Sequence, residues 1–331
     1  GINMIYVDAF GGDYAPDAMV KGAVLAVQEF NREITLVGHE EKIKEVFDKN
    51  NLSMDKISII HAPEEITCHD ESALAIRRKK QSSLVVAANL IKEDRNSVLV
   101  TAGSTGAVLS AGVLVTGRIK GVKRPALGAV LPARKKPILL MDCGANADCT
   151  SEYIKQFASM SSIYMKYVMG VENPKVALAN IGSEEEKGNK LYKETHQVLK
   201  ETEDINFAGN MEGTDIMNSD NDVIVCDGFT GNIILKTIEG MGNLMKDILK
   251  DVFYTNTKTK LSYVLTKSVL NKEMAKLSSK RYGGAPLLGV NGGIIKAHGN
   301  SDETAFKNAI GQAIKFEENE VLEKIKNIYA K

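Results

Sequence analysis

The sequence predicts an α/β protein with a doubly wound, mostly parallel sheet, and three observations support this fold class. Short runs of apolar, often β-branched residues alternate with longer stretches of helical periodicity. The short runs are apolar at nearly every position, which is typical of parallel strands buried on both faces. The composition, with 44% hydrophobic and 25% charged residues among 331, is sufficient for a large buried core.

The strands and helices can be placed in order along the chain. The strands are expected at 4–7, 34–37, 57–60, 98–101, 127–131, 138–141, 176–179 and 223–226. The helices between them are expected at 17–30, 39–49, 82–94, 104–118, 151–169 and 185–201. The segment 132–137 is too short for a crossover helix, so the strands on either side of it are predicted to form an antiparallel hairpin in a mixed sheet.

A helical hairpin is predicted at 235–280, as an insertion within a single domain that spans 4–331. Ile238, Met241 and Met245 fall on one face of its first helix, and the break between the helices lies near 254–257. Lysines are dense on the polar side of both helices. An apolar stripe of this kind fits packing against the core, a dimer surface or contact with anionic lipid.

Charge and cysteine content narrow the function classes. Lys and Arg together number 42, as do Asp and Glu, and this balance argues against a general nucleic-acid binder. None of the four cysteines has the spacing of a zinc site, so no metal is expected. The sequence has neither an N-terminal signal pattern nor an apolar run long enough to span a membrane, so we expect a cytoplasmic protein.

Glycine-rich loops at the predicted strand ends are the candidate functional segments, because ligands of open α/β sheets bind there. The first loop contains Asp8, Gly11, Gly12 and Asp13. The second loop, between a strand and a helix, is suited to cradle an anion with its backbone N–H groups and hydroxyls; it contains Gly103, Ser104, Thr105 and Gly106. Further polar loops lie at 142–148, 180–188, 227–232 and 283–293.

Glycine alone often does no more than make a turn, but several such loops that converge on one sheet edge indicate a phosphate site. The sequence contains no P-loop motif, and no dinucleotide fingerprint follows the first strand, so an NTPase and a standard dinucleotide site are disfavoured.

Seven motifs, in order, resemble the bacterial phosphate acyltransferase family of phospholipid synthesis (PlsX), from Met4 to about Gly299. They lie at 7–13, 102–107, 124–126, 142–146, 209–213, 226–232 and 283–289. Two positions depart from the family pattern. Phe10 stands where a smaller or more flexible apolar residue is expected, and Ser104 where Asn is common, which puts one side-chain contact in doubt.

The resemblance implies that a fatty acyl group moves from the thioester of acyl carrier protein to inorganic phosphate. The acyl phosphate product would supply a glycerol-3-phosphate acyltransferase at the membrane. The implied fold is similar to that of isocitrate dehydrogenase and phosphotransacetylase, and no cofactor is expected. The implied protein is a homodimer in the cytoplasm, peripheral to the inner face of the cell membrane. Its hairpin would then shape an acyl-chain cleft and a dimer surface, and contact lipid at its tip.

Site residues follow from the loops and the resemblance together. We expect Gly103, Ser104, Thr105 and Gly106 to bind phosphate, with Asn146 nearby. Lys187 is the cation of a polar loop after a strand, and Asn232 begins a helix; both are expected to be catalytic by stabilising developing charge. The remaining substrate-binding candidates are Asp8, Gly11, Gly12, Asp13, Gly231 and His298.

Other interpretations stay open at this point. Lys187 is also compatible with an ordinary exposed lysine paired with Glu184. Cys143 could form an acyl-enzyme, although no histidine is close in sequence to activate it. Basic segments, such as 77–80 and 134–136, are candidates to dock the acidic acyl carrier protein. The competing functions are a short-chain phosphotransacetylase that uses acyl-CoA, a nicotinamide-dependent dehydrogenase and a non-catalytic scaffold.

Overall fold

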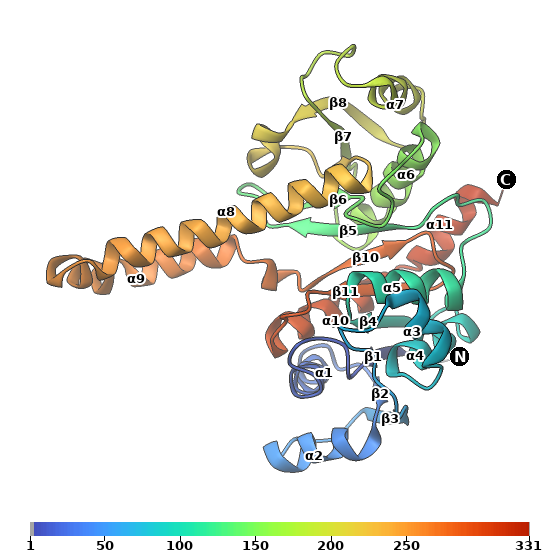
Figure 1. The fold of residues 1–331 in the computed structure, drawn as a ribbon, viewed down its shortest axis with the longest axis vertical. Coiled ribbons are helices and arrows are strands. Elements are labelled where there is room, and N and C mark those ends of the chain that lie inside the picture. The colour runs from blue at the N-terminus through green and yellow to red at the C-terminus, as the bar shows by residue number, and fades with distance from the viewer. Residues whose placement is uncertain (1–2, 331) are drawn as a thin grey trace.

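The structure is a computed structural model that describes residues 3–330, and these residues form one 11-stranded sheet flanked by helices (Figure 1). The strands are β1 Ile5–Asp8, β2 Ile34–Gly38, β3 Ile57–His61, β4 Val98–Thr101, β5 Ala126–Leu131, β6 Ile138–Met141, β7 Lys175–Asn180, β8 Asn206–Glu212, β9 Val223–Val225, β10 Gly284–Leu288 and β11 Gly293–Ala297.

The helices cover both faces of the sheet. They are α1 Asp17–Phe30, α2 Glu40–Asn50, α3 Ser72–Arg78, α4 Ser83–Glu93, α5 Thr105–Ala111, α6 Ser151–Tyr167, α7 Lys190–Lys200, α8 Gly228–Tyr254, α9 Thr257–Lys276, α10 Glu303–Glu318 and α11 Val321–Tyr329. Three short helical segments, η1 Gly112–Thr116, η2 Gly213–Asn218 and η3 Ser279–Arg281, complete the set.

Every predicted strand is present, and each of its ends lies within one residue of the predicted position. The strands β8, β10 and β11 were missed. Pro286 lies inside β10 and glycines begin both β10 and β11, so these strands carry the residues that usually signal turns. The strand β8 is only partly buried and carries polar residues, because it closes one edge of the sheet.

The sheet contains two groups of parallel strands that run in opposite directions. The strand order is β3-β2-β1-β4-β11-β10-β5-β6-β9-β7-β8. Pairing is parallel from β3 to β11 and again from β6 to β8, but it is antiparallel at β11–β10, β10–β5 and β5–β6. Three reversals place the carboxyl ends of the two groups at opposite edges. The predicted mixed sheet is confirmed, and the polar loops of the two groups leave the sheet at opposite edges.

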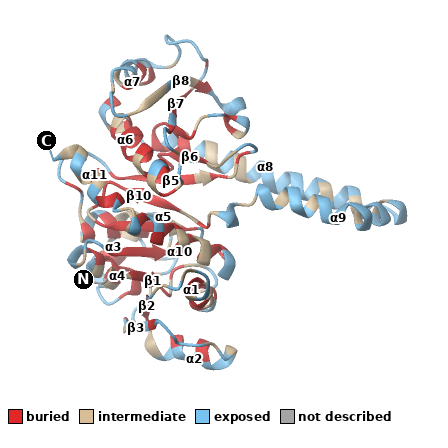
Figure 2. Ribbon diagram, turned by 180° about the vertical axis from the view of Figure 1, so that it is seen from behind, coloured by how far each residue is buried: buried red, intermediate tan, exposed pale blue. Residues whose placement is uncertain are grey.

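Along β1, the core divides between the two faces of the sheet. Ile5 and Val7 of β1 belong to the larger cluster with α1 and α10, whereas Tyr6 between them belongs to a second cluster with α4 and α5. This alternation is the period of two that a strand imposes on its side chains. The buried residues therefore follow the sheet and the inner faces of its helices (Figure 2).

The predicted helical hairpin is formed by α8 and α9, which project from the body of the protein (Figure 1 and Figure 2). The break falls at Thr255 and Asn256, as predicted, and the Asn256 side chain caps α9. Helix α8 begins at Gly228 and not near 235, because the Asp227 carboxylate accepts a hydrogen bond from Thr230 N (2.8 Å) and caps the helix there. No helix of residues 3–330 has the length and apolar character needed to cross a bilayer.

Candidate active site

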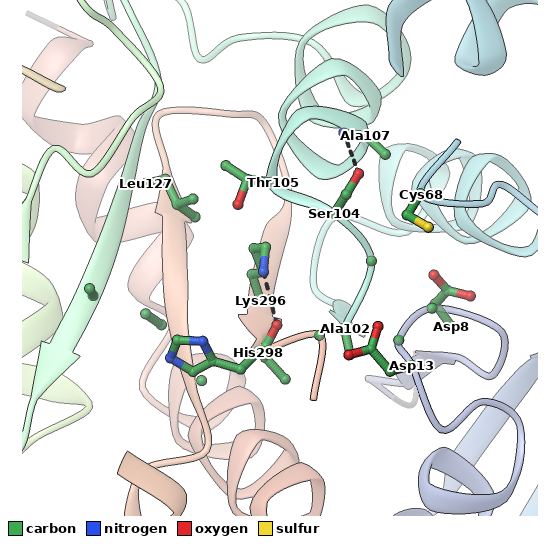
Figure 3. Close-up of a pocket in the computed structure, with 18 of the residues that line it drawn as sticks. Asp8, Asp13, Cys68, Ala102, Ser104, Thr105, Ala107, Leu127, Lys296 and His298 are labelled. Atoms are coloured by element: carbon green, nitrogen blue, oxygen red, sulfur yellow. Dashed lines mark hydrogen bonds between the residues drawn. The ribbon is translucent and has the colours of Figure 1, made fainter. Parts of the chain in front are cut away.

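A cavity of about 860 Å³ lies where several of the predicted loops meet. Its walls come from the loops after β1, β4, β6 and β11, from the start of β10, from residues 127–130 of β5 and from the first turns of α8. Figure 3 shows Asp13, Ser104 and His298 from the loops after β1, β4 and β11. The carboxyl ends of β1, β4 and β11 lie at the same edge of the sheet, because these strands run parallel. The cavity is the candidate site because it brings together most of the polar loops that the sequence singled out.

Asp8 lines this cavity, and its side chain holds neighbouring segments together by hydrogen bonds. Its buried carboxylate accepts hydrogen bonds from Ser83 Oγ (2.6 Å), Thr101 Oγ1 (2.8 Å) and Phe10 N (3.1 Å). Burial raises the pKa of the Asp8 carboxyl, while these hydrogen bonds act in the opposite direction. Asp8 therefore connects the end of β1 to the end of β4 and to α4.

Gly11 and Gly12 allow the first loop to lie directly against its neighbours. A Cβ atom on Gly11 would lie 2.8 Å from Gly103 N, and Gly12 has a φ of +112°. The next residue, Asp13, donates its backbone N–H to Gly299 O (2.7 Å) and lies exposed at the cavity. The loops after β1, β4 and β11 are therefore held together by backbone contacts.

The predicted anion loop is divided between two roles. Gly103, Ser104 and Thr105 line the cavity, and Ser104 Oγ caps α5 by accepting from Ala107 N (3.3 Å; Figure 3). Gly106 does not line the cavity. A Cβ atom at this position would lie 2.5 Å from Ser72 Oγ, so Gly106 allows α3 and α5 to pack closely.

Asn146 also lies outside the cavity lining. Its side chain donates to Pro125 O (2.8 Å) and to the Asp142 carboxylate (3.0 Å), which also accepts from Leu127 N (3.0 Å). Burial is the main cause that raises the pKa of Asp142, to about 6. Asn146 thus fixes the loop after β6 against β5.

Helix α8 supplies Asn232, the second predicted catalytic residue, to the cavity wall. Gly231 is buried against Asp142 O and Cys226 Sγ, and its lack of a side chain lets α8 start next to β6. One turn beyond Asn232, Lys236 lines the same cavity and pairs with Glu239 (Nζ to Oε2, 2.9 Å). Lys236 was not predicted from the sequence. It follows Asn232 by four residues, and this spacing places both side chains on one face of the helix.

Strand β11 contributes a second missed cation. Lys296 lines the cavity together with His298, and its ammonium donates to Ala297 O (3.0 Å; Figure 3). Desolvation is the main cause that lowers the pKa of Lys296, to about 8. The pKa of His298 is also lowered, first by desolvation and then by the charge of Lys296. The sequence does contain a signal for Lys296. It precedes His298 by two residues, and this spacing places both side chains on the same face of a strand.

Lys187 does not line the cavity. It is exposed in the loop after β7, and β7 runs opposite to β1, β4 and β11, so this loop lies at the other edge of the sheet. The loop is nevertheless held in place: Asn180 Nδ2 donates to Lys187 O (3.1 Å), and Asn210 Nδ2 donates to Glu184 O (2.7 Å). Within residues 3–330, Lys187 forms no ion pair with Glu184.

Cys143 lines the cavity but is poorly suited to act as a nucleophile. It is buried, and its thiol donates weakly to Leu140 O (3.5 Å). Burial raises the pKa of this thiol well above its ordinary value, so the reactive thiolate is disfavoured.

With this geometry in place, comparisons identify the family. The sequence profile of a family described as "Fatty acid synthesis protein" matches residues 4–324. This chain belongs to that family. It is 45% identical over 328 residues to the phosphate acyltransferase of Clostridioides difficile (strain 630), with 99% of this chain and 96% of that protein covered. It is 49% identical over 321 residues to that of Alkaliphilus oremlandii (strain OhILAs), with 97% and 96% covered. The resemblance drawn from the seven motifs is thereby confirmed.

Solved structures confirm the predicted fold class. The EutD phosphotransacetylase from Staphylococcus aureus superposes with a TM-score of 0.61 at 15% identity, covering 95% of this chain and 94% of that one. The 4-hydroxythreonine-4-phosphate dehydrogenase from Klebsiella pneumoniae superposes with a TM-score of 0.55 at 10% identity, covering 96% and 100%. At these identities the likeness concerns the fold alone.

Proposed function

We propose that this chain is an acyltransferase that moves an acyl group from a thioester to inorganic phosphate. In this reaction a phosphate oxygen bonds to the thioester carbonyl carbon, the C–S bond breaks, and the thiolate leaves and takes up a proton. The observation that carries the proposal is a single cavity that combines an anion loop, Gly103–Ser104–Thr105, with two lysines, Lys236 and Lys296. The names of the relatives support the same reaction.

We propose a fatty acyl group carried on acyl carrier protein as the donor. The cavity volume of about 860 Å³ would be left mostly empty by an acetyl group, and Leu127, Val130 and Leu235 give it apolar wall. Basic segments at 77–80 and 134–136 are suited to an acidic carrier protein, so turnover with this donor should fall steeply as salt rises. An acyl-CoA donor with a short acyl group is the alternative.

In the proposed mechanism, the protein positions phosphate and stabilises the carbonyl oxygen. Gly103, Ser104 and Thr105 would orient phosphate, which is a competent nucleophile near neutral pH. The Asn232 side-chain amide would donate a hydrogen bond to the thioester oxygen as negative charge develops on it. A donor of this kind is worth about 10²-fold to 10³-fold in rate.

The other predicted residues would contribute mainly by shaping the site. We propose that Gly11, Gly12 and Asp13 form one wall for the substrate and that His298, neutral near pH 7, contacts it as a hydrogen-bonding group. Asp8 would hold this wall in position. The buried Gly231 and the two residues outside the lining, Gly106 and Asn146, would act through packing and hydrogen bonding behind the cavity.

We propose that Lys187 acts in the site of a second subunit. Its loop lies away from the cavity of its own chain, yet it is exposed and held by Asn180 and Asn210. A homodimer that places this loop over the partner's cavity would reconcile the two facts. If so, mixed dimers of Lys187→Ala and Asn232→Ala chains should regain part of the activity that each homodimer lacks. Inactive mixed dimers would contradict this arrangement.

We propose that the hairpin places the enzyme at the inner face of the membrane. The apolar side chains of α9 that would insert, Leu261, Val264, Leu265 and Val269, are 62–76% exposed. The stripe along α8, which includes Met241 and Met245, would cover the acyl chain and contact the second subunit. Release of the acyl phosphate there would bring it near a glycerol-3-phosphate acyltransferase.

The deciding experiment is an assay of the purified chain with phosphate and either long-chain acyl carrier protein or acetyl-CoA. Trapping with hydroxylamine converts an acyl phosphate to a hydroxamate that can be quantified. We expect a phosphate-dependent product with the long-chain donor and little with acetyl-CoA. A preference for acetyl-CoA would favour the short-chain alternative, and no acyl phosphate with any donor would refute the acyltransferase function.

A further inference from the structure

We propose that Lys296 binds the attacking phosphate directly, as the cationic wall of a phosphate subsite whose other wall is the Gly103–Ser104–Thr105 loop. This inference rests on the proposed function and adds a residue that neither the sequence reasoning nor the comparisons pointed to.

The strand register places Lys296 beside the anion loop. Strand β11 pairs with β4 in parallel, and Lys296 is the register partner of Thr101. The loop that begins at Ala102 therefore leaves the sheet next to the lysine. Figure 3 shows Lys296, Ser104 and Thr105 around one cavity, and all three belong to its lining. An anion held by the loop hydroxyls would lie within reach of the lysine side chain.

The charge of Lys296 is uncompensated. None of the ion pairs among residues 3–330 includes Lys296, whose ammonium donates only to the carbonyl of Ala297. The acidic residue of the neighbouring helix, Glu239, pairs with Lys236. Holding an ammonium away from water with one neutral acceptor is costly, and a bound anion removes that cost. A partly desolvated, unpaired cation that lines a cavity is a typical anion-binding group.

The protonation of Lys296 predicts a particular pH dependence of phosphate binding. With a pKa lowered to about 8, Lys296 is mostly charged near pH 7 and loses its charge as pH rises. The charged groups that act on it are Lys236, which lowers its pKa further, and Glu239, which raises it, both from α8. His298, just beyond the end of β11, is the other titratable group beside it. His298, with its lowered pKa, is already neutral above pH 8, and phosphate is mainly a dianion there. Weakening of phosphate binding above this pH would therefore report on Lys296.

The test compares Lys296→Met, Lys296→Arg and the wild type in steady-state kinetics with phosphate and acyl donor varied separately. Lys296→Met keeps the length of the side chain and removes its charge. We expect it to raise the KM for phosphate at least tenfold, since a hydrogen bond to a charged group is worth about that much, while the KM for the acyl donor stays within about threefold. Lys307→Met is the matched control, because Lys307 is a partly buried lysine on α10 that pairs with Glu29 outside the cavity.

The pH profile separates a binding role from a structural one. The KM for phosphate of the wild type should begin to rise near pH 8, whereas Lys296→Arg, which keeps its charge, should remain flat to about pH 10. Parallel profiles of the two proteins would overturn the proposal, as would an unchanged phosphate KM in Lys296→Met. If Lys296→Met does not fold, the arginine profile decides alone.

Calorimetric titration with inorganic phosphate distinguishes this inference from the proposed function. If the wild-type protein binds phosphate through Lys296 but forms no acyl phosphate, only the proposed function is refuted. If the wild-type protein forms acyl phosphate and Lys296→Met binds phosphate equally well, only the role of Lys296 is refuted.

Discussion

Replacing Lys296 with methionine is expected to stabilise the phosphate-free protein even though it impairs phosphate binding. The cavity lowers the pKa of this lysine from 10.5 to about 8, mainly through desolvation. Each tenfold change in proton affinity corresponds to about 1.4 kcal/mol, so the charged form is disfavoured by about 3 kcal/mol at neutral pH. The neutral, similarly shaped methionine avoids that cost and loses one hydrogen bond to Ala297 O, worth about 1 kcal/mol.

The net expectation is a gain of about 2 kcal/mol, which for a chain of 331 residues corresponds to a rise in Tm of about 3 °C. The gain has a defined pH dependence. Because the folded pKa is depressed, the cost of the charged lysine is fully present below pH 8 and disappears as pH rises from about 8 to 10.5. The variant should therefore be the more stable protein below pH 8 and should lose this advantage as the pH approaches 10.5.

Differential scanning calorimetry in phosphate-free buffer at pH 7 and pH 10 checks this expectation. Added phosphate should raise the Tm of the wild type more than that of the variant, since only the wild type keeps the binding cation. The control Lys307→Met loses an ion pair and gains no relief from desolvation, so it should not be stabilised. A lower Tm for Lys296→Met at pH 7, or a difference independent of pH, would refute the reasoning.

Three further predictions concern α8 and the hairpin. Asn232→Ala should lower kcat about 10²-fold while the phosphate KM changes little, measured by hydroxamate trapping; a change confined to KM would contradict its role at the carbonyl oxygen. Gly231→Ala should destabilise the fold by about 1–3 kcal/mol in thermal melts because its Cβ would collide with Asp142 O. Gly240→Ala, in open space on the same helix, should be neutral or stabilising. Val264→Glu with Leu265→Glu should abolish vesicle flotation but leave turnover in solution intact; unchanged flotation would refute lipid contact.

The sequence by itself determined the elements and the segments that carry function. Apolar runs such as 98–101 and 138–141 are strands because their residues are buried on both faces, and this local pattern is readable without tertiary information. The polar loops with Asp8, Gly103 and Asn232 were found because each follows a predicted strand, where ligands of open α/β sheets bind. The motif order was sufficient to indicate the family.

Only the tertiary structure decided which of these residues share a cavity. Lys187 follows β7, which lies beyond β6 and β9 in the strand order, and its loop does not reach the cavity. The segments after β6 and β9 do reach it and supply Cys143 and Asn232. Lys296, in contrast, lines the cavity and was missed. It lies in a strand that begins with glycine, and its distinction as an unpaired, desolvated cation depends on strands and helices far away in the sequence. Desolvation and pairing are properties of the assembled sheet, whereas periodicity is a property of the chain.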